Sequence, residues 1–96
     1  MLEIRPVCEN CNKDLPNDSG EAMICTFECT FCSDCVTSVL DNVCPNCGGG
    51  FEKRPIRPRE KLLKFPQTSE KHHKPVDVIK FETVLSKNRD IDPRKR

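Results

Sequence analysis

The hydrophobic pattern of this 96-residue chain predicts short elements separated by polar turns. The run from Ala22 to Phe31 is rich in strand-forming residues and predicts a short β-hairpin. After it, apolar residues recur at helical spacing, which predicts a helix over residues 35–41 that Ser33 or Asp34 can cap. The first half of the chain therefore predicts a small α+β unit.

The second half has a weaker pattern. Residues 54–59 are punctuated by proline and are expected to be extended, and residues 59–65 can form one or two helical turns. An apolar stripe at helical spacing over residues 78–85, preceded by Asp77, predicts an amphipathic helix with a cap. We expect the charged residues 88–96 to be disordered.

The composition limits the size of the core. Only 35% of the residues are hydrophobic, and the chain has neither Trp nor Tyr. We expect Phe27, Phe31 and Phe51 to pack in a small core within residues 1–55. A unit of that size obtains only a few kcal/mol from its core, so a metal or disulfide staple is usual.

Eight cysteines occupy one stretch of the first half, where they are grouped in four pairs. Two residues separate the members of three pairs, and three residues separate Cys25 from Cys29. A structural zinc ion takes four thiolates in a tetrahedron, so the four pairs suffice for two zinc ions with no ligand left over. The sequence therefore predicts two Zn²⁺ ions bound by Cys8, Cys11, Cys25, Cys29, Cys32, Cys35, Cys44 and Cys47.

A disulfide framework is the alternative interpretation of eight cysteines, and it requires an oxidising compartment. Residues 1–6 show no basic segment followed by an apolar one, as a secretion signal would. No stretch approaches the roughly 20 apolar residues of a membrane span. We therefore expect a cytoplasmic metal-binding protein with no membrane association.

The net charge of +1 conceals two halves of opposite sign. Residues 1–50 contain two Lys or Arg against eight Asp or Glu, a net charge of −6, and residues 51–96 contain fourteen against seven, a net charge of +7. We expect this contrast to bring part of residues 51–65 onto the acidic half, while the last residues remain mobile. Exposed ion pairs contribute only about 0–1 kcal/mol each, so this contact should be partial.

The order of the cysteine pairs is similar to that of the RING finger, in which the pairs alternate between two zinc ions in a cross-brace. The Phe31-Cys32 step and the closing Cys44-Pro45-Asn46-Cys47 segment carry this resemblance. It implies a small zinc-stabilised α+β fold with a short hairpin and one helix in residues 1–55, followed by a partly helical or disordered tail over residues 56–96. It also implies a first site of Cys8, Cys11, Cys32 and Cys35 and a second site of Cys25, Cys29, Cys44 and Cys47. Sequential pairing is the alternative, but cross-bracing ties the ends of a core-poor module to its middle.

A second resemblance is more specific. The segments 1–6, 44–49 and 54–58 resemble a bacterial family of small Cys-rich proteins known as a domain of unknown function, over about residues 1–65. This resemblance implies a compact zinc-binding protein. It brings no established activity.

The sequence favours a binding module, in which the two zinc sites scaffold a surface for another protein. Nucleic-acid binding through the basic residues 53–64 is an alternative, but phosphate would repel the acidic half and stacking aromatics are few. A ubiquitin-ligase RING is disfavoured. Such ligases resemble each other in an apolar residue between the first two zinc ligands and an Arg after the last, and this chain has Glu9-Asn10 and Gly48 at those places. Zinc release on thiolate oxidation remains open.

We do not expect an enzyme. A site with four thiolates is closed and leaves no position for an activated water. His72 and His73 have no cysteine nearby and are expected to be solvated surface residues. A monomer is expected.

Overall fold

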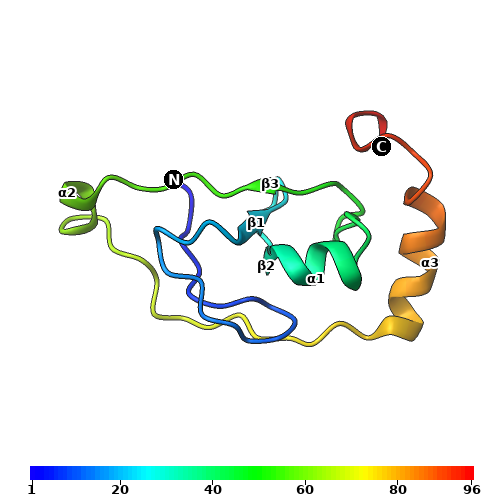
Figure 1. Ribbon diagram of the computed structural model, residues 1–96, viewed down its shortest axis with the longest axis horizontal. Helices are drawn as coiled ribbons and strands as arrows, with labels where there is room; N and C mark the ends of the chain where they lie inside the picture. Colours follow the sequence, from blue (N-terminus) through cyan, green and yellow to red (C-terminus); the bar gives the residue numbers. More distant parts are fainter.

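A three-stranded antiparallel sheet organises the first half of the chain in the computed structural model, which describes residues 1–96 (Figure 1). The strand order is β2-β1-β3. The elements in chain order are β1 (Ala22–Ile24), β2 (Thr30–Cys32), α1 (Ser33–Ser38), β3 (Glu52–Lys53), α2 (Arg59–Leu62), α3 (Val78–Asn88) and a 3₁₀ turn (Pro93–Lys95).

The expected hairpin is present, with Met23 opposite Phe31 in the β1–β2 pair. The third strand was not predicted, because two residues are too few to show an alternating pattern. It pairs antiparallel with the other edge of β1, with Met23 opposite Lys53. The sheet therefore ties residues 52–53, which precede the tail, to the centre of the first half.

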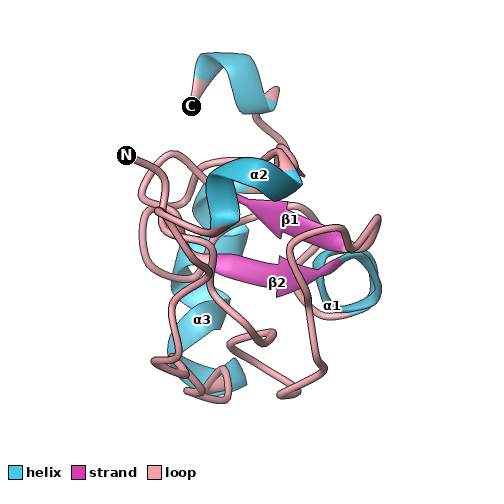
Figure 2. Ribbon diagram, turned by 90° about the vertical axis from the view of Figure 1, so that its left-hand side faces the viewer, coloured by secondary structure: helices cyan, strands magenta, loops and turns pink.

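Helix α1 begins at Ser33, two residues earlier than the pattern predicts. It follows β2 directly, with no loop between the strand and the helix (Figure 2). The capping prediction was wrong: the N-cap is Cys32, which has extended backbone and makes no side-chain capping bond. The N–H of Ser33 instead donates to the carbonyl of Glu21 at 2.8 Å. Strand and helix are thus one continuous segment.

The aromatic core differs from the prediction in one residue. Phe31 and Phe51 are buried, and their rings meet edge to face with centroids 5.5 Å apart at 77°. Phe27 was wrongly placed in the core: it lies in the turn between Cys25 and Cys29 and is 71% exposed. Most of the cysteines are buried with the two aromatic rings, so the core is built around sulfur.

The tail follows a defined course around the first half (Figure 1). It runs from β3 to α2 at one end of the molecule and returns along the N-terminal loop to α3 at the other end. We call the returning segment, residues 66–77, the strap. The strap is bound by backbone hydrogen bonds from Thr68 to Ile4 at 3.0 Å and from Lys74 to Glu9 at 2.7 Å.

The predicted helix of the tail is present as α3, and Asp77 caps it by accepting from the N–H groups of Ile79 and Lys80. Phe81 of this helix is buried. The expected disorder of residues 88–96 is not found: Pro93–Lys95 form a 3₁₀ turn, and the Arg96 guanidinium donates to the carbonyl of Asn42 at 2.7 Å. None of the helices is long and apolar enough to cross a membrane.

Candidate metal centres

Four sulfur atoms from distant parts of the chain meet in a first cluster, site 1. Cys8 and Cys11 form the first hook, residues 8–11, in the N-terminal loop, while Cys32 ends β2 and Cys35 lies in α1. All four Sγ atoms lie within 4.8 Å of one another. Cys11 is exposed and the other three are buried. The β2–α1 segment and the first hook thus contribute two sulfurs each.

A second cluster, site 2, contains Cys25, Cys44 and Cys47, whose Sγ atoms also lie within 4.8 Å of one another. Cys44 and Cys47 belong to the last hook, residues 44–47. Cys29 does not lie within this distance of all three, although the neighbouring thiol of Cys44 is the main influence that lowers its pKa. Cys47 is exposed and the other sulfurs of this group are buried.

The first and last hooks share one local conformation. The residues that follow them, Asn12 and Gly48, have positive φ angles of 66° and 78°. Their N–H groups donate to the carbonyls of Cys8 at 3.0 Å and Cys44 at 2.8 Å. Each hook is therefore closed by a left-handed residue, a conformation that Asn and Gly adopt most readily.

The side chain at the third position of each hook donates to a sulfur across its cluster. Asn10 Nδ2 lies 3.3 Å from Cys35 Sγ, and Asn46 Nδ2 lies 3.3 Å from Cys29 Sγ. A donor to sulfur stabilises the thiolate form and fixes its direction. Sequence reasoning missed both residues, although an asparagine at the same position of two hooks was the signal.

When no cation is bound, burial and contact between thiols shift the pKa values of several cysteines away from the ordinary value of a thiol. Burial raises the pKa of Cys25 to about 11 and that of Cys35 to about 12. Hydrogen bonds from Cys44 and Asn46 lower the pKa of Cys29 to about 5, and the contact with Cys29 raises the pKa of Cys44. Buried thiolates repel one another, so the full set ionises together only around a cation.

The donor sets fit a tetrahedral metal ion. With Zn–S bonds of about 2.3 Å, the edges of a sulfur tetrahedron are about 3.8 Å long. Cys11 Sγ and Cys32 Sγ are 3.8 Å apart. A disulfide requires about 2.05 Å, and all eight cysteines are free. The two clusters can therefore hold metal ions, with the thiolates as ligands.

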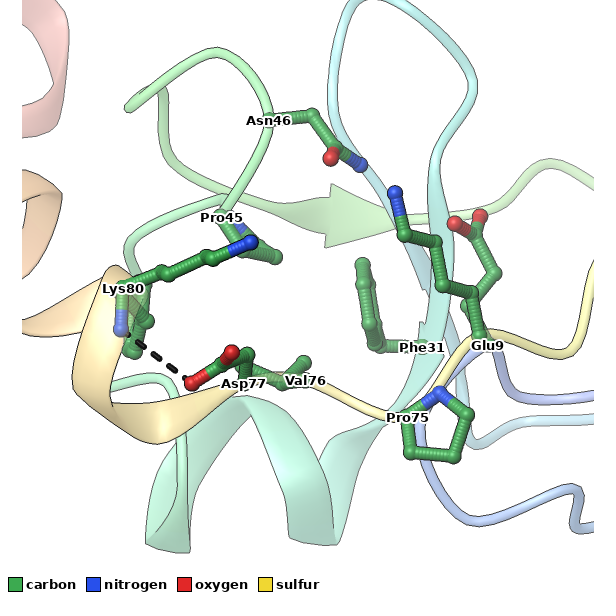
Figure 3. A pocket seen from close by; sticks show the side chains of 10 residues that line it. Glu9, Phe31, Pro45, Asn46, Pro75, Val76, Asp77 and Lys80 are labelled. Atoms are coloured by element: carbon green, nitrogen blue, oxygen red, sulfur yellow. Dashed lines mark hydrogen bonds between the residues drawn. The ribbon is translucent and has the colours of Figure 1, made fainter.

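A cavity of about 350 Å³ lies between the two hooks (Figure 3). Phe31 forms part of its wall, Glu9 borders it from the first hook and Pro45 from the last, and Lys80 reaches it from α3. Lys74 and Lys80 line this cavity without taking part in any of the ion pairs of the structure. Two acidic residues line it as well, but Glu9 pairs with Arg5 and Asp77 caps α3.

The model of a family described as a protein of unknown function (DUF1272) matches residues 1–57, which is more than half of the chain. The chain belongs to the DUF1272 family. The sequence resemblance to a Cys-rich family of unknown function is thereby confirmed. The matched region contains the eight cysteines, both hooks and the sheet.

An uncharacterized protein of Rhizobium meliloti (strain 1021) is 55% identical over 75 residues, which cover 78% of this chain and 89% of the relative. An alignment of 75 residues is longer than the family region, so it includes part of the tail. No solved structure matches this chain.

Proposed function

We propose that this DUF1272 protein binds two structural zinc ions in a RING-like cross-brace, one at each site. Cys29 would complete site 2 as its fourth ligand. The observation that carries the proposal is the convergence of four Sγ atoms within 4.8 Å from segments far apart in sequence. Cys11 and Cys32, 21 residues apart, are in contact, whereas sequential pairing would place Cys25 and Cys29 in site 1.

Zinc suits these sites for chemical reasons. Tetrahedral four-sulfur sites select zinc or iron in proteins, and zinc needs no redox partner or added sulfide. The module is small and six of the 14 residues of its core are cysteines, so binding energy of roughly 10–16 kcal/mol per structural zinc would supply much of its folding energy. Free thiols of this density belong to a reducing compartment, which supports a cytoplasmic location.

We propose further that the zinc sites scaffold a surface for another protein, and that this surface is the cavity between the hooks. A volume of about 350 Å³ accommodates a side chain of a partner. The carboxylates of Glu9 and Asp77 in this cavity already have partners within the protein, whereas Lys74 and Lys80 form no ion pair, so an acidic segment of the partner can pair with the two lysines. Nothing in this role requires a reaction, so a binding module is the simplest function consistent with closed four-thiolate sites.

Nucleic-acid binding by residues 53–64 has less support. The Arg54 guanidinium is 4% exposed and donates to the carbonyls of Arg5, Leu15 and Pro16. Arg57 donates to carbonyls of Leu2 and Phe65. Two of the cations that this segment would offer to phosphate are therefore engaged within the protein.

Metal analysis and ¹¹³Cd-substituted NMR test the proposal. We expect two zinc ions per chain and two cadmium signals, one coupled to the Cβ protons of Cys8, Cys11, Cys32 and Cys35 and one to those of the other four cysteines. Chelation should abolish the fold, and zinc should restore it. Iron in place of zinc, a single ion, or a cadmium ion coupled to Cys8 and Cys25 together would contradict the proposal.

The same zinc-loaded protein serves as bait for the partner. A partner that uses the cavity is retained by the wild type and lost by a Lys74→Glu/Lys80→Glu double variant, whose two zinc ions remain bound. A Lys61→Glu/Lys64→Glu variant is the matched control, because it changes the same charge in the exposed segment near α2. Loss of binding in the control alone would move the interface to residues 53–64.

A further inference from the structure

Asn10 and Asn46 occupy the same position in the two hooks, but their surroundings differ. Both donate Nδ2–H to a sulfur of the facing pair at 3.3 Å. Only Asn10 also accepts a hydrogen bond from the tail: its Oδ1 lies 3.0 Å from the backbone N of Val76. One amide thus touches a proposed metal ligand with its nitrogen and the strap with its oxygen.

The first hook binds the strap at neighbouring points as well. The N–H of Lys74 donates to the carbonyl of Glu9 at 2.7 Å, and Nε2 of His73 lies 3.3 Å from the carbonyl of Asn10. Asp77, the next residue after Val76, caps α3. The first hook therefore holds the end of the strap in place, immediately before the start of α3.

The last hook has no such connection through its asparagine. The hydrogen bond of the Asn46 side chain goes to Cys29, within the first half of the chain. Contact between the last hook and α3 is made instead by packing at Gly48, where an added Cβ would lie 2.8 Å from Asn88 Nδ2. The two sites are thus equivalent in their thiolates and unequal in their links to the tail.

We propose that Asn10 couples metal binding at site 1 to docking of the strap. Asn46 provides no such coupling, so metal binding at site 2 does not affect the strap through this side chain. The inference rests on the proposed metal binding at site 1. Cys35 would hold a cation at site 1 and be held in place by it; its sulfur accepts the N–H of the Asn10 amide and thereby orients it, and the oriented Oδ1 accepts the Val76 N–H. Coupling of this kind is reciprocal, so a docked strap also favours metal at site 1.

The test compares zinc-loaded full-length wild type with Asn10→Ala and its matched control, Asn46→Ala. Partners that orient metal ligands typically contribute about 10- to 100-fold to metal affinity. We expect each variant to lose affinity of that order at its own site, measured by cadmium titration with one NMR signal per site. Amide hydrogen exchange at Lys74 should become at least about tenfold faster in Asn10→Ala and stay unchanged in Asn46→Ala.

A reverse variant keeps the proposal testable if Asn10→Ala does not fold. Val76→Pro removes the N–H that Asn10 accepts and leaves every residue near the sulfurs intact. Reciprocity predicts weaker metal binding at site 1 and unchanged binding at site 2. Equal exchange at Lys74 in both asparagine variants, or unchanged affinity at site 1 in Val76→Pro, would overturn the coupling. Wild-type protein that does not bind two metal ions would overturn the proposed function instead.

Discussion

Arg54 anchors the segment that leads from β3 into the tail. Its guanidinium donates to the carbonyls of Arg5, Leu15 and Pro16 at 2.8, 3.0 and 2.8 Å. Burial lowers the pKa of Arg54, and its Nε has no partner. The buried cation is satisfied by carbonyl dipoles rather than by a carboxylate, and its two terminal nitrogens reach three carbonyls at once, a geometry that only the guanidinium group provides.

Replacement of the buried Arg54 should therefore destabilise the protein more than replacement of an exposed basic residue would. We expect Arg54→Ala to lower the free energy of unfolding by about 2–4 kcal/mol, because it leaves buried carbonyls without donors. The measurement is denaturant unfolding of the zinc-loaded protein. Lys53→Ala is the control: Lys53 precedes Arg54 in the chain but is exposed, so its replacement should change the free energy of unfolding by less than about 0.5 kcal/mol. Equal effects of the two changes would show that the guanidinium bonds contribute little.

At the scale of elements, none of the helices is long enough to be stable alone. Isolated helices of fewer than about 12 residues are marginal in water, and the longest here, α3, has 11 residues. Its one buried side chain, Phe81, is 4% exposed and packs in the core with the cysteines, and the partly buried Val84 and Leu85 pack against the same core. Its outer face carries Val78 and Ile79, which are 63% and 83% exposed.

Phe81→Ala should release α3 and leave the sheet in place. Truncation of a buried Phe typically costs about 3–5 kcal/mol, more than a helix of this length can offset on its own. Amide exchange should become fast throughout residues 78–88 and remain slow in β1 and β2. Ile79→Ala is the control. It removes an exposed side chain from the same helix without changing the core, so amide exchange should remain slow in α3 and in the two strands. If Phe81→Ala also unfolded the sheet, α3 would be a structural part of the first half.

At the scale of the whole molecule, the opposite charges of the two halves contribute less than the sequence suggests. Only two ion pairs join residues 1–55 to the tail: Arg89 with Asp41 at 3.1 Å, and His72 with Glu3 at 3.0 Å when the histidine is protonated. The other links are hydrogen bonds of the backbone and of side-chain amides, the Arg57 and Arg96 donors on carbonyls, and buried Phe81. The segment after β3 does contact the first half, as expected, but the charge contrast is not the reason.

The docked tail should consequently resist salt. Raising the NaCl concentration from about 0.05 M to about 1 M shortens the screening length from above 10 Å to about 3 Å and weakens exposed ion pairs. We expect the radius of gyration of the zinc-loaded protein, measured by small-angle X-ray scattering, to stay constant across this range. Arg54→Ala at high salt is the contrasting sample, in which expansion is expected. Expansion of the wild type with salt would restore charge attraction as the main link.

The sequence by itself determined the local features. The cysteine spacing, the strand-forming run at Ala22 and the capped stripe at Asp77 each lie within a few residues, and short-range geometry shows in a linear pattern. Only the tertiary structure decided which segments meet. The pairing of β3 with β1, the burial of Arg54 and the bridge from Cys35 through Asn10 to Val76 all depend on contacts across tens of residues. Such contacts follow from the joint packing of the whole chain, because a single arginine or asparagine carries no sign of its distant carbonyl, sulfur or amide partner.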